Sequence, residues 1–124
     1  MRGWMMLALA FLAWPLVVAA AEGKKEEPMI DIHWLGHDAF RIVDALKQVY
    51  FDPYQLPDGL PKADVIFITH SHGDHCSPED VAKIAKADTV IVATADSAVK
   101  LPGRKTVIVK PGDSVEAAGL KAKK

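Results

Sequence analysis

Hydrophobic and polar residues alternate in the stretch MIDIHWLG, residues 29–36. Its apolar side chains stand at every second position, at Ile30, Ile32 and Trp34. Because successive side chains of a strand point to opposite faces, this period of two predicts a half-buried strand. AFRIVDA (residues 39–45) and QVYFD (residues 48–52) have the composition of two further strands, with Lys47 and its neighbours as the turn between them.

A loop and a buried strand follow. Residues 53–64, PYQLPDGLPKAD, contain three prolines and a glycine and therefore predict a loop. Residues 65–68, VIFI, form a short continuous apolar run with β-branched members. Such a run is typical of a strand that is covered on both faces.

The segment SPEDVAKIAKA, residues 77–87, has the signals of a helix start. Ser77 is suited to cap the helix, Pro78 fits its first position, and acidic residues stand in the first turn, where the helix dipole is positive. The apolar residues recur with helical spacing, at Val81, Ile84 and Ala85. They predict one buried stripe.

The rest of the chain alternates in the same way between strand and helix patterns. TVIVAT (89–94) predicts a buried strand, ADSAVKL (95–101) a short helix and KTVIV (105–109) another strand. A turn at PGD then leads into SVEAAGLKAKK (114–124). This alternation predicts a mixed α/β layer.

The N-terminal segment has a different character. Arg2 precedes an apolar run over residues 4–18, and small residues follow, with an A-x-A pattern at Ala19 and Ala21. This order predicts a signal peptide over residues 1–21 and hence a secreted or periplasmic protein; the alternative is an uncleaved anchor helix. Residues 22–28 are polar and predict a linker to a domain at 29–124.

Composition narrows the choice of partners. The chain has 124 residues, enough for one small domain, and its net charge of −1 gives no reason to expect nucleic acid or an anionic membrane as partner. Cys76 is the single cysteine, so the chain cannot form an internal disulfide.

Three histidines and an aspartate crowd the segment THSHGDH, residues 69–75. His70 and His72 follow the buried strand two positions apart, which puts both imidazoles on one side of an extended segment. Gly73 permits a tight turn that brings Asp74 and His75 back toward them. Imidazole and carboxylate are ligands for Zn²⁺ and also suit Fe or Mn, so the pattern predicts a metal centre; the alternative is a solvated histidine-rich loop.

These residues resemble a known family. THSHGDH resembles the H-x-H-x-D-H motif of the metallo-β-lactamase superfamily, and IHWLGHDAFRI with VYFDP resembles its lactonase-like and N-acyl-phosphatidylethanolamine phospholipase D-like branch. The resemblance covers roughly residues 29–120. It implies an α/β fold, the N-terminal half of an αββα sandwich with a mixed sheet and helices on one face.

The resemblance also implies chemistry. His70 and His72 match ligands of a first Zn²⁺ ion, and Asp74 and His75 match ligands of a second; Mn²⁺ or Fe²⁺ are alternatives. The family reaction is hydrolysis of an ester, lactone, amide or phosphodiester by a metal-bound hydroxide, which Asp74 would help to orient.

Three further residues are assigned less directly. Asp52 resembles the acid beneath the site that holds an imidazole in place, although it equally suits a strand-end turn with Pro53. His37 resembles a pocket residue near the site, with a buried structural histidine as the alternative. Cys76 is interpreted as a packing residue rather than a ligand.

The superfamily site also takes a histidine, a bridging aspartate and a last histidine from further downstream, whereas no histidine follows His75. The sequence therefore predicts an incomplete domain, negligible activity for this chain alone, and possible self-association through an uncovered sheet face. Either the chain is a truncated product or it dimerises into a composite site. The alternative function is a non-catalytic secreted metal-binding or interaction module.

Overall fold

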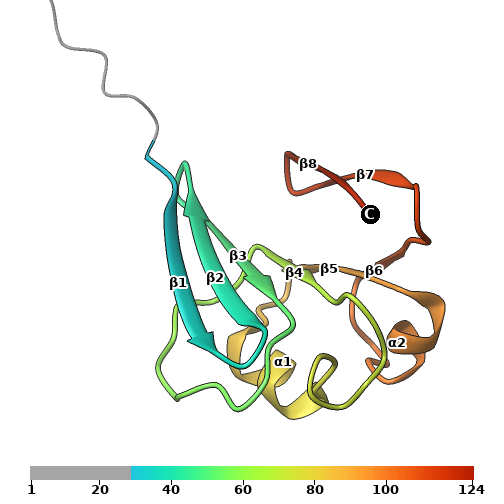
Figure 1. Ribbon diagram of the computed structural model, residues 1–124, viewed down its shortest axis with the longest axis horizontal. Helices are drawn as coiled ribbons and strands as arrows, with labels where there is room; N and C mark the ends of the chain where they lie inside the picture. The colour runs from blue at the N-terminus through green and yellow to red at the C-terminus, as the bar shows by residue number, and fades with distance from the viewer. Residues whose placement is uncertain (1–28) are drawn as a thin grey trace, which may run out of the picture.

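The computed structural model describes residues 29–124. Six strands form one mixed sheet in the order β1-β2-β3-β4-β5-β6, and β7 and β8 form a separate hairpin (Figure 1). The strands are β1 (Asp31–Gly36), β2 (Ala39–Asp44), β3 (Lys47–Phe51), β4 (Val65–Phe67), β5 (Val90–Ala93), β6 (Thr106–Ile108), β7 (Ser114–Ala117) and β8 (Leu120–Lys123). The helices are α1 (Pro78–Ile84) and α2 (Ala95–Val99). The predicted signal peptide and linker lie outside the described residues.

The sheet changes from antiparallel to parallel at β3. β1, β2 and β3 pair antiparallel, as short turns require, whereas β3 to β6 run parallel. α1 connects β4 to β5 and α2 connects β5 to β6, and both helices lie on the same side of the sheet (Figure 1). The predicted mixed sheet with helices on one face is confirmed. In the part of the chain that the structure describes, no helix has the length and hydropathy needed to cross a bilayer.

Two apolar clusters lie on opposite faces of the sheet because side chains alternate along each strand. Tyr50, Ile66 and Ile91 pack toward the helices, against Val81 and Ile84 of α1, and all five are fully buried. The second cluster faces the β7–β8 hairpin and is built mainly of valines, Val49, Val65, Val90, Val92 and Val109. Val65 and Ile66 of β4 are fully buried on the two opposite faces, as the continuous apolar run predicts, although the strand ends at Phe67 rather than at residue 68.

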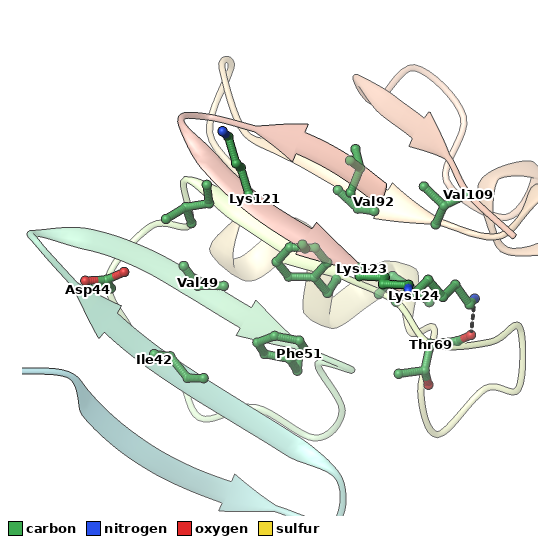
Figure 2. A pocket seen from close by; sticks show the side chains of 15 residues that line it. Ile42, Asp44, Val49, Phe51, Thr69, Val92, Val109, Lys121, Lys123 and Lys124 are labelled. Atoms are coloured by element: carbon green, nitrogen blue, oxygen red, sulfur yellow. Dashed lines mark hydrogen bonds between the residues drawn. The ribbon is translucent and has the colours of Figure 1, made fainter. Parts of the chain in front are cut away.

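The β7–β8 hairpin covers the second face only in part. A groove of about 480 Å³ remains between the hairpin and the sheet, and Phe51 and Phe67 stack at its floor with ring centroids 4.9 Å apart (Figure 2). Lys124 closes one end, where its Nζ donates a hydrogen bond to the Thr69 carbonyl oxygen at 2.9 Å. The sequence pattern did not predict this hairpin. Its turn uses Ala118 and Gly119, both with positive φ, as two-residue hairpin turns do.

The prediction for β1 is wrong in one respect. Ile32 and Trp34 are 62% and 68% exposed, although their alternation predicted a buried face. They pair with Ile42 and Phe40 and so share the face of the second cluster, but that cluster includes no residue of β1. β1 is the edge strand, and the covering hairpin packs against the strands from β2 onward.

The boundaries of two other elements, α1 and β3, are also corrected. α1 ends at Ile84 rather than at residue 87, because Ala85 is already extended. Its start is as predicted, with Ser77 as the cap and Pro78 in the first turn. β3 begins at Lys47, so the turn lies at Ala45 and Leu46, and the strand ends before Asp52.

Candidate metal centre

The candidate ligands come from three loops at one edge of the sheet. The segment after β4 carries His70, His72, Asp74 and His75, and Asp52 directly follows the neighbouring parallel strand β3. The β1–β2 turn adds His37. The first of these loops is compact, because the backbone N–H groups of His75 and Cys76 both donate to the His72 carbonyl oxygen, at 3.0 and 2.7 Å.

The structure brings every predicted site residue into this region. The imidazole of His70 lies beside those of His75 and His72, with ring centroids 4.0 and 4.7 Å away. The ring of His37 lies 5.5 Å from that of His75, and its Nε2 is 3.0 Å from Oδ2 of Asp74. His37 is therefore a half-exposed neighbour of the motif rather than a buried structural histidine.

Asp52 is the buried acceptor beneath the motif. Its carboxylate accepts hydrogen bonds from the Thr69 N–H at 2.7 Å, the Thr69 hydroxyl at 2.6 Å and Nδ1 of His75 at 2.9 Å. Asp52 also has a positive φ of 41°, so the strand-end turn and the supporting role both apply to this one residue. Because Nδ1 of His75 donates to Asp52, its Nε2 is left free to bind a metal ion.

Thr69 extends the same support to His70. The Thr69 hydroxyl donates its hydrogen to Asp52, so its oxygen can accept from Nδ1 of His70, 2.9 Å away. His70 then also presents Nε2 outward. Sequence reasoning missed Thr69; the only signal was its position directly before the first histidine of the motif.

The electrostatics of the site follow from these contacts. The hydrogen bond to Asp52 raises the pKa of the His75 imidazole, and this outweighs the opposite effect of burial. The hydrogen bond from His37 holds the pKa of the Asp74 carboxyl below its ordinary value. Carboxylates thus surround the histidines, an arrangement that attracts a cation.

The donor atoms fit a metal ion. Two groups of three residues each bring one ligand atom per residue to within 4.8 Å of the others: His37, Asp38 and His75, and Asp52, His70 and His75. Imidazole nitrogens and carboxylate oxygens are ligands that divalent transition ions accept. Sequence reasoning did not single out Asp38, which follows His37 in the β1–β2 turn.

Cys76 is not part of this donor set. It is 1% exposed, it belongs to the helix-side core, and burial raises the pKa of its thiol. Its interpretation as a packing residue agrees with this placement.

Comparison with known proteins identifies the family. The sequence profile of the Beta-lactamase superfamily domain matches residues 31–124. The chain belongs to the metallo-β-lactamase superfamily. The resemblance of THSHGDH to the superfamily motif is thereby confirmed, whereas membership of the lactonase-like branch stays a prediction.

Similar members of the superfamily are described as metal-dependent hydrolases. The chain is 32% identical over 104 residues to a UPF0173 metal-dependent hydrolase of Thermoplasma acidophilum, covering 76% of this chain and 45% of the relative. It is 38% identical over 106 residues to one of Thermococcus onnurineus, covering 75% of this chain and 45% of the relative. The chain therefore spans less than half the length of these relatives.

Solved structures agree on the fold. A crystal structure from Parabacteroides distasonis, described as a metal-dependent hydrolase, superposes with a TM-score of 0.64 at 34% identity, covering 69% of this chain and 40% of the other. A metallo hydrolase of Ignicoccus hospitalis superposes with a TM-score of 0.56 at 20% identity, covering 70% and 42%, and shows the fold alone.

Proposed function

We propose that this chain carries the metal-binding motif of a hydrolase that cleaves an ester, lactone or phosphodiester bond. The observation that carries the proposal is the buried Asp52 carboxylate, which orients His75 directly and His70 through Thr69. Such oriented imidazoles are what a metal-ligating site requires. The described hydrolase relatives support the reaction class, and the motif resemblance supports the bonds named.

The motif residues have distinct roles in this proposal. His70 and His72 would hold one ion, and Asp74 and His75 a second, with Zn²⁺ as the first choice and Mn²⁺ or Fe²⁺ as alternatives. A bound ion supplies Lewis-acid activation of water near neutral pH. Asp74, whose side chain is 42% exposed, can accept a hydrogen bond from that water and so orient it toward the substrate.

The test of the proposal uses this chain together with any sequence that follows it in the same reading frame. The protein is stripped with a chelator, reloaded with Zn²⁺, Mn²⁺ or Fe²⁺, and assayed on p-nitrophenyl acetate, a γ-lactone and bis(p-nitrophenyl) phosphate. We expect hydrolysis of at least one substrate that is lost on chelation and in His72→Ala. If no ion restores hydrolysis of any of the three, the proposal is wrong.

For the 124-residue chain alone we expect negligible turnover. The motif gives the first ion only His70 and His72, whereas catalytic zinc sites generally have three protein ligands. Measurable hydrolysis by this chain that disappears in His72→Ala would contradict the expectation.

The second candidate function is a non-catalytic metal-binding or interaction module. Two groups of three ligand-type residues within residues 29–124 favour it, because each group could hold a metal ion without residues from elsewhere. Calorimetry on the chain discriminates the two. One tightly bound Zn²⁺ ion without turnover supports the module, whereas absence of binding counts against it.

We also propose that the chain self-associates through the second face of its sheet. The exposed side chains of Ile32, Trp34 and Phe40 continue the apolar surface beyond the groove. An apolar surface of this kind is stabilised by contact with another one. For the chain in isolation, the partner that is always present is a second copy.

The location of the protein is proposed from sequence order alone. Arg2, the apolar run and the small residues before position 22 support export and cleavage after Ala21. Expression in a bacterium, fractionation and mass spectrometry of the N-terminus test this. A mature N-terminus near Glu22 in the periplasm is expected, and intact residues 1–21 on a membrane-bound chain would favour the anchor instead.

A further inference from the structure

The β1–β2 turn places two ligand-type side chains beside the motif. Oδ2 of Asp38 lies 3.6 Å from Nε2 of His37 and 3.5 Å from Nε2 of His75. Oδ2 of Asp74 completes the arrangement, 3.0 Å from the same atom of His37 and 3.6 Å from that of His75. The four atoms therefore form a closed ring in which nitrogen and oxygen alternate.

The ligand atoms of His37, Asp38 and His75 lie within 4.8 Å of one another, a grouping that suits a single ion. Ligand atoms bound ~2.0–2.2 Å from one ion lie roughly 2.8–3.6 Å apart when they are neighbours in an octahedral or tetrahedral arrangement. All four separations in the ring fall in this interval. Three of them exceed ordinary hydrogen-bond lengths, so hydrogen bonding accounts only for the contact between His37 and Asp74.

The turn is built to hold His37 in this place. His37 has a φ of 48°, a left-handed conformation that costs free energy for a residue other than glycine. Its carbonyl oxygen accepts a hydrogen bond from Nε1 of Trp34 at 2.9 Å, and its ring packs edge-on against Tyr54 with centroids 5.5 Å apart. These contacts offset the strain and direct the imidazole toward Asp74.

The charge around the ring also calls for a cation. Within residues 29–124, neither Asp38 nor Asp74 has an ion pair with a lysine or arginine; both face only His37 and His75. Asp52 adds a third carboxylate behind His75. A divalent ion at the ring would balance the two facing carboxylates.

We propose that His37, Asp38 and His75 form one divalent-cation site, to which the β1–β2 turn supplies two ligands and beside which Asp74 adds negative charge. The site rests on the proposed function in sharing His75 with the hydrolase motif. It adds a pair of ligands from a different element, so one ion is held entirely by residues 29–124.

The test measures metal binding by the full 124-residue chain, independently of hydrolysis. The chain is stripped with a chelator and titrated with Zn²⁺ by calorimetry and with Co²⁺ by visible absorption. Asp38→Asn and His37→Gln are each expected to weaken Zn²⁺ binding at least ~10-fold and to change the Co²⁺ spectrum. The matched controls are Asp31→Asn and His33→Gln, which alter an exposed aspartate–histidine pair on the same hairpin, 2.9 Å apart, and should leave both readouts unchanged.

A second series separates this site from the first two histidines of the motif. The double variant His70→Gln with His72→Gln is expected to keep one Zn²⁺ ion, which the further change Asp38→Asn then removes. Far-UV circular dichroism checks that each variant remains folded, and only folded variants are compared. The Asp38 side chain is 59% exposed, so its substitution is expected to leave the fold intact.

The proposal is overturned if Asp38→Asn and His37→Gln bind Zn²⁺ as the unaltered chain does, or if the folded double variant binds none. Neither result would exclude hydrolysis, because His70 and His72 could still hold an ion. Conversely, if Zn²⁺ binding depends on Asp38 but no substrate is hydrolysed, the proposed hydrolase function is wrong and the proposed cation site still stands.

Discussion

The carboxylate of Asp52 shows how one residue can organise a site. A buried carboxylate is stable only if its oxygens are hydrogen-bonded, and Asp52, 3% exposed, accepts three such bonds. Two of its donors belong to Thr69 and the third is the ring of His75. The cost of burying the charge is thus offset by contacts that also fix the direction of the ligands.

Asp52→Asn is expected to weaken Zn²⁺ binding by about 10- to 100-fold, because the amide accepts fewer hydrogen bonds and leaves the imidazoles less firmly oriented. Calorimetry on the stripped chain measures the effect. Asp58→Asn, at a side chain 94% exposed, is the control and should bind as before. Equal affinity of the Asp52 variant and the control would rule out the orienting role.

Asp80 is a second buried carboxylate, and its role is structural. Burial by itself would raise the pKa of Asp80, but hydrogen bonds from the Ser77 hydroxyl and the backbone N–H groups of Leu56 and Gln55 outweigh it and lower the pKa below 3.8. A lowered pKa in the folded state means that the stabilisation is present above the ordinary pKa and is lost as the pH falls through the folded-state value.

Asp80→Asn is therefore expected to lower the free energy of unfolding at pH 7 by about 1–3 kcal/mol. Below about pH 4 the free energy of unfolding of the variant should also fall less steeply with pH than that of the unaltered chain. Urea unfolding at a series of pH values measures both. If the free energy of unfolding depends on acidic pH in the same way in both proteins, the Asp80 contacts contribute little to stability.

At the scale of elements, α1 is held by packing rather than by its length. It spans only Pro78–Ile84, and helices this short are marginal in isolation. Val81 and Ile84, both fully buried against the sheet, anchor it. Its N-terminus backs the motif loop, so the packing of α1 also supports the metal centre.

Ile84→Ala is expected to lower the free energy of unfolding by about 2–5 kcal/mol, because it removes buried methyl groups and leaves a cavity. Val99→Ala in α2 is the matched control. Its side chain is 82% exposed, and the expected change is within about 0.5 kcal/mol. Chemical denaturation of both variants measures these changes. Similar losses of unfolding free energy at the two positions would contradict the assignment of the core.

For the molecule as a whole, the unequal cover of the two sheet faces is the main structural fact. The helix side is closed, whereas the other side keeps an open groove and an exposed apolar edge at Ile32. If this edge mediates self-association, Ile32→Lys should shift the chain toward monomer in sedimentation experiments. Val99→Lys, on the helix side, should have no such effect, and a chain that is monomeric without substitution would refute the proposal.

The sequence alone determined most of the elements and the ligand motif. Periods of two and of 3.6, the cap at Ser77 and the proline-rich loop act over a few residues, so they can be recognised without knowing the fold. The H-x-H-x-D-H spacing is local in the same sense and indicated a metal centre directly. The strand register and the edge position of β1 have no such local signal, and the expected burial of Ile32 and Trp34 was accordingly wrong.

Only the tertiary structure decided what surrounds the motif. Asp52 reaches His75 across 23 positions of the chain and His37 reaches Asp74 across 37, because parallel pairing and the β1–β2 turn bring these loops to one edge. Thr69 connects Asp52 to His70 through a hydroxyl whose partners are set by that arrangement. Hydrogen bonds and metal coordination depend on distances of a few ångström between side chains, and those distances exist only once the sheet has formed.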